Sequence, residues 1–164
     1  LKMMWRAIPD IGALKIYKIE LFNRTIYFVN LFAANDPTST IKVYNSLKLR
    51  DMKDYKVVLI CNSRADRLDR IEQYKEILGR ELVADYYILT GAFTEHISDE
   101  LVKKGVPEKN IFEIKGNDPK EVFDKVLELG FGILVAVGVG NIGGMGHRIV
   151  KYFSTRGEEC LRLP

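Results

Sequence analysis

The chain has 164 residues, of which 47% are hydrophobic and 29% are charged, and its formal net charge is +3. This length and composition are those of one ordinary globular domain with a substantial core. So small a charge gives no support for a nucleic-acid or membrane-surface partner, the two cysteines form no disulfide or zinc pattern, and no apolar run reaches transmembrane length.

The first residues are predicted to precede the domain proper. Residues 1–7 have the pattern of an amphipathic helix that is cut off before Pro9, and the turn-forming run 9–12 is predicted to be a linker. We therefore expect residues 1–13 to be the end of a preceding-domain helix and a linker, and residues 14–164 to be a single domain. A chain that starts inside an element suggests a piece of a longer protein, and a leader or a trimmed tag is the competing explanation.

The rest of the chain alternates between strands and helices. Strands are expected at 14–21, 24–32, 57–61, 86–89, 111–114 and 133–137, and helices at 37–47, 68–78, 94–104, 119–129 and 143–155. The first two strands are joined by a short turn, and the later ones are continuously apolar, as is typical of strands buried on both faces. This order predicts an α/β fold, a three-layer Rossmann-like sandwich whose mostly parallel sheet carries an N-terminal antiparallel hairpin.

In such sheets ligands bind beyond the carboxyl ends of the strands. The regions of Asn35, Arg64, Thr90 and Asn141 all follow predicted strands. We therefore expect the chemistry of this protein at that edge of the sheet.

The segment after the second strand opens a helix. Asp36 is a good N-cap, and Pro37 suits the first helical position. A helix N-terminus has free N–H groups and a partial positive charge, so this corner could hold a phosphate or another anion. The alternative is a well-capped helix and nothing more.

The segment after the third strand is rich in charge. It contains three arginines and two aspartates, at Arg64, Asp66, Arg67, Asp69 and Arg70. Arginine matches a carboxylate or a phosphate with a bidentate fork. A helix would place Arg67 and Arg70 on one face, and Asp66 could cap that helix or orient Arg70. The alternative is a solvated, salt-bridged helix start.

A glycine-rich stretch follows the last strand. Gly138, Gly140 and Gly143 match G-x-G-x-x-G, which alone would suggest NAD binding. That fingerprint normally opens the first βαβ unit and is followed by an acidic strand end. Here it lies in the last unit, and Glu158 and Glu159 lie on a tail with no following strand. The pattern favours a tight turn that faces a ligand or a partner domain.

Other familiar catalytic arrangements are missing from the sequence. The histidines, His96 and His147, lie in separate predicted helices, and no Ser-His-Asp or Cys-His arrangement can be identified. Cys61 follows an apolar run and is interpreted as a small buried residue rather than a nucleophile. The sequence has no P-loop, G-x-x-x-x-G-K-[ST], so a main phosphate cradle for ATP is missing from this chain.

Three motifs in order resemble a known family. They are Phe-Ala-Ala-Asn-Asp-x-x-Ser-Thr at 32–40, Asn-x-Arg-Ala-Asp-Arg-x-Asp-Arg at 62–70 and Gly-Val-Gly-Asn-Ile at 138–142. Together they resemble the C-terminal domain of the poly-γ-glutamate synthase ligase subunits of capsule biosynthesis, which are similar to Mur ligases and folylpolyglutamate synthases. The run Pro9–Lys15 also fits the hinge of that family, with Gly12 and Lys15 as its hinge residues.

The resemblance implies an ATP-dependent carboxylate–amine ligase that works through an acyl phosphate. The domain would close over ATP and the incoming amino acid, and alone it would be inactive. The residues implied to face the nucleotide are Asn35, Asp36, Thr38 and Ser39. The residues implied to face substrate carboxylates or phosphate are Arg64, Asp66, Arg67, Arg70 and Asn141. Many Mur ligases have histidine in the first motif, where this chain has Ala34 and Asn35, and no hinge arginine is evident.

The same resemblance implies cofactors, partners and a location. ATP and Mg²⁺ would be bound mainly by a central ATPase domain, either upstream or on a separate chain. The substrate would be glutamate or another acidic amino acid, with membrane subunits of a capsule synthase as partners and no nucleic acid. The location would be the cytoplasm, or the inner face of the membrane through the full-length protein or its partners. The alternatives are a stand-alone nucleotide or acidic-metabolite binding module and, on the glycine pattern only, an NAD-dependent oxidoreductase.

Overall fold

The computed structural model describes residues 14–32, 34, 36–130 and 132–164. The predicted helix end and linker at 1–13, which include the hinge residue Gly12, lie outside the described residues, as does Asn35.

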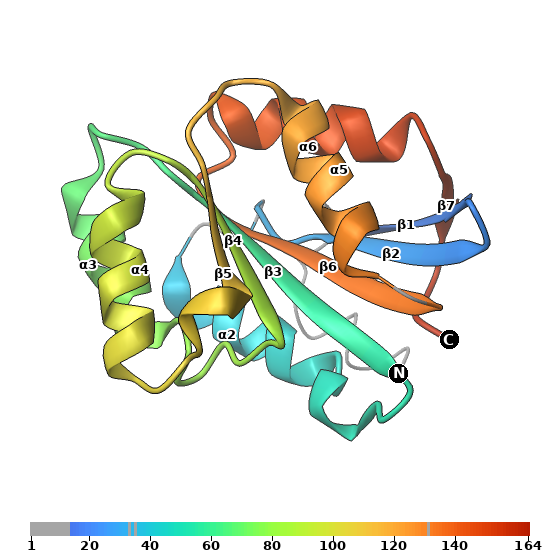
Figure 1. Ribbon diagram of the computed structural model, residues 1–164, viewed down its shortest axis with the longest axis horizontal. Helices are drawn as coiled ribbons and strands as arrows, with labels where there is room; N and C mark the ends of the chain where they lie inside the picture. The colour runs from blue at the N-terminus through green and yellow to red at the C-terminus, as the bar shows by residue number, and fades with distance from the viewer. Residues whose placement is uncertain (1–13, 33, 35, 131) are drawn as a thin grey trace.

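Seven strands in the described part of the chain form one sheet in the order β5-β4-β3-β6-β2-β1-β7 (Figure 1). Their bounds are β1 (Lys15–Leu21), β2 (Arg24–Asn30), β3 (Tyr55–Ser63), β4 (Tyr86–Gly91), β5 (Ile111–Ile114), β6 (Ile133–Gly140) and β7 (Glu158–Cys160). The five strands from β5 to β2 are parallel, while β1 pairs antiparallel with both β2 and β7. This arrangement confirms the predicted Rossmann-like sheet with its N-terminal hairpin.

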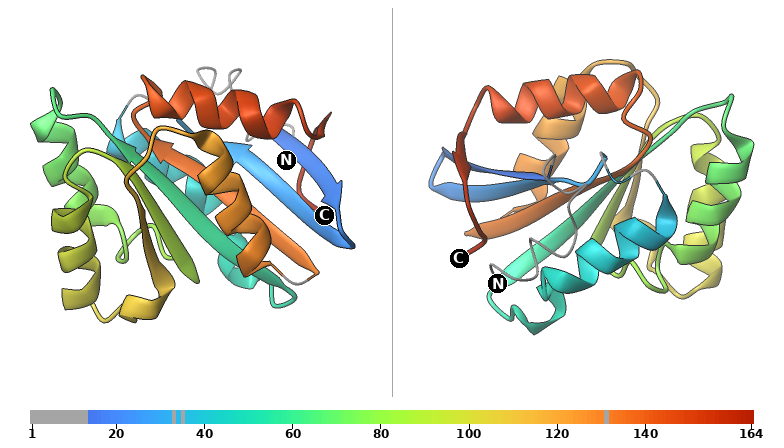
Figure 2. Two further views of the ribbon diagram at one scale, coloured as in Figure 1. Left: turned by 45° about the horizontal axis from the view of Figure 1, so that its top comes forward. Right: turned by 180° about the vertical axis from the view of Figure 1, so that it is seen from behind.

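The helices cover both faces of the sheet (Figure 2). They are α2 (Pro37–Ser46), α3 (Leu68–Ile77), α4 (Thr94–Lys103), α5 (Pro119–Leu129) and α6 (Met145–Ser154), with short 3₁₀ turns at Leu49–Asp51 and Glu108–Asn110. Helices α2, α3 and α4 pack in one hydrophobic cluster, and α5 and α6 pack in the other. Within the described ranges, no helix combines the length and the apolar character that crossing a membrane requires.

The sequence pattern of β3 explains why the sheet lies between two helical layers. Val57, Leu59 and Cys61 belong to the cluster with α2, α3 and α4, while Val58 and Ile60 belong to the cluster with α5 and α6. All five are buried. Since successive strand residues point to opposite faces, a strand that is apolar at every position needs a layer on each side.

Two features of the sheet differ from the sequence prediction. The tail after α6 contains the short edge strand β7, which pairs with Ile16–Lys18 of β1. Strands β3 and β6 also run to Ser63 and Gly140, beyond their predicted ends, because their backbones stay paired as far as Asn62 and Gly140. The polar Asn62 and the first two glycines of the G-x-G-x-x-G pattern are therefore strand residues rather than loop residues.

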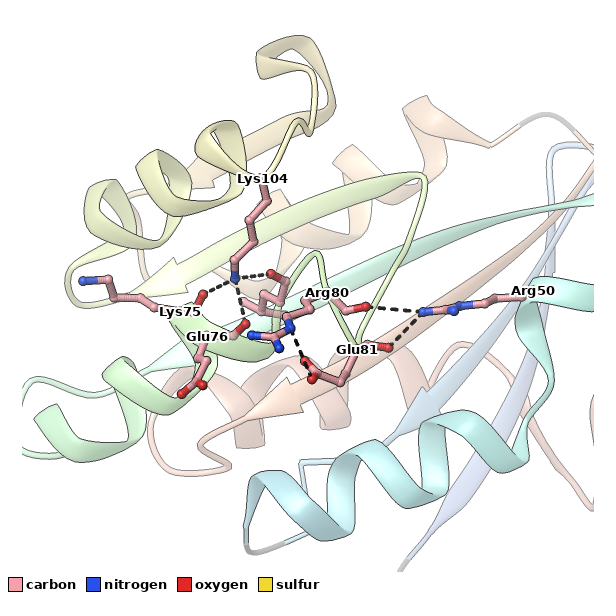
Figure 3. A network of polar contacts seen from close by, with 7 residues as sticks. Arg50, Lys75, Glu76, Arg80, Glu81 and Lys104 are labelled. Carbon is pink, nitrogen blue, oxygen red and sulfur yellow. Dashed lines mark hydrogen bonds and ion pairs between the residues drawn. The ribbon is translucent and has the colours of Figure 1, made fainter.

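A lysine from the end of α4 holds the C-terminus of α3 in place (Figure 3). The amine of Lys104 donates to the carbonyl oxygens of Glu76 at 2.8 Å and Leu78 at 2.7 Å, and also to that of Lys75. These carbonyls have no partner within the helix, and a cation is favoured beside them by the helix dipole. Burial nevertheless lowers the pKa of Lys104. The contact anchors the helix that carries Arg70 and Tyr74.

Candidate functional site

The parallel strands end together at one edge of the sheet, where β3 and β6 are neighbours. The chain leaves β3 towards α3 on one face and leaves β6 towards α6 on the other. In open α/β sheets, ligands bind where the connections of adjacent strands diverge in this way. The candidate site is therefore the segment after β3 together with the turn after β6.

Asn62 joins these two segments. Its Nδ2 donates to the carbonyl oxygens of Asn141 at 2.8 Å and Gly143 at 3.1 Å, and its Oδ1 accepts from the hydroxyl of Thr90 at 2.9 Å. Asn62 and Thr90 are 2% and 0% exposed, so the bond between them is buried, while the two bonds to the turn end on half-buried residues. One buried amide thus connects the ends of β3 and β4 with the turn after β6.

Close packing accounts for the glycines of the G-x-G-x-x-G pattern. A Cβ on Gly138 would lie 2.3 Å from the Phe32 ring, and one on Gly140 would lie 2.3 Å from the Asn62 carbonyl oxygen. A Cβ on Gly143 would lie 2.6 Å from Nη1 of Arg64. Contacts within the fold therefore explain Gly138 and Gly140 without a bound dinucleotide, whereas at Gly143 the nearest atom is the end of the flexible Arg64 side chain.

The arginines of the charged segment have different neighbours. Arg64 donates from Nε and Nη2 to the two carboxylate oxygens of Asp66, at 3.0 and 2.8 Å. Asp66 was expected to cap α3 or to orient Arg70, but the cap position is held by Arg67, whose side chain makes no cap bond. Arg67 instead lies 3.7 Å from Asp69 of its own helix. These ion pairs are solvent-exposed, and such pairs contribute little to stability.

Helix α3, which carries Arg70, packs against the first turn of α2. The hydrogen bonds from Ser39 lower the pKa of Asp36 more than the charge of Arg70 does, and for Tyr74 that charge only partly counters the effect of burial. Burial raises the pKa of Tyr74 to about 12, and its hydroxyl lies 3.3 Å from the Thr40 hydroxyl. The first turn of α2 and helix α3 therefore meet at the contact between Thr40 and Tyr74.

Asp36 caps α2 as predicted. Its Oδ1 accepts from the backbone N–H of Ser39 at 2.8 Å, and its Oδ2 accepts from the Ser39 hydroxyl at 2.9 Å. These bonds are the main reason that the pKa of Asp36 is lowered. A carboxylate thus already occupies the positive end of α2, while Thr38 is exposed. At this helix start the geometry agrees with the capping interpretation.

We expect Asp36→Ala to lower the free energy of unfolding by about 1 kcal/mol at neutral pH, the usual cost of losing an N-cap. The pKa of Asp36 is lower in the folded state, so the carboxylate contributes fully above its unfolded value near 4 and this contribution is lost as the pH falls through the folded-state pKa. Urea unfolding at several pH values measures both effects. Asp36→Asn is the matched control, because asparagine can cap but cannot titrate. A difference between wild type and Asp36→Ala that does not shrink in acid would contradict this role.

The remaining predicted residues are more dispersed. Lys15 begins β1 opposite Asn30, the last residue of β2, and its amine lies 3.8 Å from a Glu159 carboxylate oxygen. Asn141 is half-buried in the turn after β6, where its N–H donates to the Asn62 carbonyl at 2.9 Å. Cys61 is buried, and burial raises its pKa to about 12, so it is a neutral thiol and a poor nucleophile.

The sequence reasoning did not assign a role to Asn62, Thr90 or Tyr74. Asn62 and Thr90 do carry a signal, since each is a polar residue at the end of an apolar strand. Their partners could not be identified, because the turn that Asn62 binds lies about 80 residues further along the chain. Tyr74 lies on the buried face of α3 with Ile71 and Ile77, and its hydroxyl contact depends on how α2 and α3 pack.

Comparison with known proteins connects this arrangement to a family. The family model "Poly-gamma-glutamate synthase CapB C-terminal domain" matches residues 16–156. The chain is 29% identical to the "Capsule biosynthesis protein CapB" of Bacillus anthracis, over 90% of this chain and 32% of that protein. It is 30% identical to the "PGA synthase CapB" of Bacillus subtilis, over 92% of this chain and 38% of that protein. The chain thus spans about a third of the length of these curated relatives.

Among solved structures, the chain is similar to MurF from Acinetobacter baumannii. The TM-score is 0.51 at 10% sequence identity, and the match covers 84% of this chain and 29% of that chain. At so low an identity this likeness concerns the fold alone.

Proposed function

Because the chain belongs to the family of poly-gamma-glutamate synthase CapB C-terminal domains, we propose that it is the C-terminal domain of an ATP-dependent carboxylate–amine ligase. In the reaction, a substrate carboxylate is converted to an acyl phosphate. The amine nitrogen of an incoming amino acid then attacks the acyl carbon, phosphate leaves with the electrons of the C–O bond, and the nitrogen loses a proton. The product is an amide.

The observation that carries this proposal is the place of Arg64 beside the glycine-rich turn at the carboxyl edge of the sheet. Guanidinium groups suit this reaction, because both the substrate carboxylates and the transferring phosphoryl group are anionic. The nitrogen Nη1 of Arg64 lies against Gly143, while Nε and Nη2 are held by Asp66. Asp66 therefore orients a cation whose remaining nitrogen faces the turn. Cations held in place before reaction stabilise the charge that develops in the transition state.

We infer that ATP and Mg²⁺ are bound mainly by a central domain outside this chain. ATP would supply the phosphoryl group. The guanidinium groups described here fit a phosphate or a carboxylate. By contrast, the described residues contain no group of three or more His, Cys, Asp or Glu side chains that could hold a metal ion. The proposed partners are that central domain, glutamate or another acidic amino acid, and the membrane subunits of a capsule synthase.

The proposal is tested with the full-length protein that contains this chain. It is incubated with ATP, Mg²⁺ and glutamate oligomers, and the nucleotide products and chain length are followed. We expect ADP and phosphate to appear together with elongated oligomers. None of these three products should form when glutamate is omitted. Release of AMP and pyrophosphate would point to an acyl-adenylate and contradict the proposal. Binding of ATP or glutamate without turnover would favour a binding module instead.

A further inference from the structure

We propose that Asn62 is a positioning residue that holds the glycine-rich turn and Arg64 in the arrangement needed for ligation. The inference rests on the proposed function. It adds a buried residue that acts through the backbone of the turn, including that of Asn141. Three observations support it: the number of bonds that Asn62 makes, their direction, and the place where they end.

The hydrogen-bonding capacity of the Asn62 side chain is nearly exhausted. An amide has two N–H donors, and both are directed to the turn, at the carbonyls of Asn141 and Gly143. Its oxygen accepts from Thr90, which is itself completely buried. A group that is buried and satisfied on both sides is held in one orientation, because every alternative leaves a polar atom unpaired.

The direction of these bonds requires an amide. On the β6 side Asn62 must donate to two carbonyl oxygens, and on the β4 side it must accept from a hydroxyl. A carboxylate of the same shape would place an acceptor against the two carbonyls. Aspartate is therefore nearly isosteric here yet has the opposite polarity where the turn is bound.

The bonds end on the irregular part of the site rather than on the strand ladder. The β3–β6 pairing already extends to Asn62 and Gly140, and the N–H of Asn141 donates to the Asn62 carbonyl at 2.9 Å. The Asn62 side chain additionally holds the backbone of the next residues, from Asn141 to Gly143, by hydrogen bonds to their carbonyl oxygens. Gly143 is also the residue against which Nη1 of Arg64 lies. A turn released from Asn62 would therefore move the surface that supports Arg64.

The test compares Asn62→Asp with wild type in the full-length protein. We expect kcat for ligation to fall about 10- to 100-fold, the size of effect that a small misplacement of catalytic groups produces. The KM for ATP should stay within about twofold, because the nucleotide is bound mainly outside this chain. A change in ATP binding itself would instead appear in KM rather than in kcat. Backbone amides of residues 141–146 should exchange hydrogen faster in the variant.

The pH profile separates positioning from a general loss of structure. As the pH falls, the carboxylate introduced by Asn62→Asp takes up a proton and regains a donor for one carbonyl. The ratio of wild-type kcat to variant kcat should therefore shrink in acid. Asn45→Asp makes the same amide-to-carboxylate change at an exposed position of α2 and is the control expected to retain near wild-type kcat. If Asn62→Asp does not fold, Asn62→Ser removes the two-carbonyl contact without a buried charge.

The outcomes are distinct. Unchanged kcat in a folded Asn62 variant, or unchanged exchange at residues 141–146, would overturn the positioning role. If the wild-type protein shows no glutamate-dependent ADP release, the proposed ligase function fails, and the exchange measurement still decides whether Asn62 holds the turn.

Discussion

Replacing Arg64 with alanine in the full-length protein is expected to lower kcat/KM for ligation by about 100- to 1,000-fold, the range found when one preorganised electrostatic contact to a transition state is removed. The stability of the protein should hardly change. The Arg64 and Asp66 side chains are 48% and 63% exposed, and exposed ion pairs typically contribute less than about 1 kcal/mol. Steady-state kinetics and thermal melting of the same preparation measure the two quantities.

The matched control is Arg80→Ala. Arg80 also carries an exposed ion pair, 3.7 Å from Glu81, but it lies beyond the C-terminus of α3 rather than at the carboxyl edge of the sheet (Figure 3). We expect its kcat/KM to remain near that of wild type. Equal activity of wild type and Arg64→Ala would remove Arg64 from the site. Equal losses of kcat/KM in Arg64→Ala and Arg80→Ala would mean that the reaction depends on the net charge of the domain rather than on the position of Arg64.

Gly140→Ala is expected to destabilise the protein by about 2–5 kcal/mol, or to prevent folding. Gly140 has φ +97°, a conformation that costs an L-residue about 1–2 kcal/mol. In addition, a Cβ would lie 2.3 Å from the Asn62 carbonyl oxygen, which is backbone and cannot move away as a flexible side chain could. Overpacking of this kind adds about 1–3 kcal/mol.

A second glycine separates these two costs. Gly105, after α4, has φ +96°, but a Cβ added there would meet nothing within 4 Å, so Gly105→Ala carries the backbone strain without the clash. Urea unfolding of both variants should show the larger loss of unfolding free energy for Gly140→Ala. The difference between the two losses is the cost of the clash with the Asn62 carbonyl. A Gly140→Ala variant no less stable than Gly105→Ala would show that β6 can move away from β3.

The parts of the fold that were predicted correctly depend on local signals. The helix predicted at 119–129 is α5, which begins at Pro119 after its N-cap Asp118, and the Asp118 carboxylate accepts from the Lys120 N–H at 2.9 Å. The apolar run of β3 required cover on both faces, which the structure has. Such features could be predicted because the physics that decides them acts over a few residues.

The parts that were missed depend on distant partners. Strand β7 has the sequence Glu-Glu-Cys, which has no strand pattern of its own, and it becomes a strand by pairing with β1 about 140 residues earlier. The ends of β3 and β6 were placed too early for the same reason, since each is extended by the other. Local sequence contains little information about such pairing.

The candidate site shows the same division. Asp36 was correctly predicted as an N-cap because its partner, Ser39, is three residues away. The prediction that Asp66 orients Arg70 was wrong, because Asp66 binds Arg64 instead. Both arginines are near Asp66 in the sequence, and only the geometry of the turn selects between them. The contacts of Asn62 could not be predicted at all, since they require β3 and β6 to be neighbours. The roles implied for Arg64, Arg67, Arg70 and Asn141 in binding substrate stay predictions.

The measurement that tests the central claim most directly is the fate of the carboxylate oxygen. The full-length protein is supplied with ATP, Mg²⁺, glutamate and an acceptor whose reacting carboxylate carries oxygen-18, and the released phosphate is analysed by mass spectrometry. If the chain is part of a ligase that works through an acyl phosphate, each phosphate released with an amide contains an oxygen-18 atom taken from the carboxylate. Amide formation with unlabelled phosphate would contradict the account.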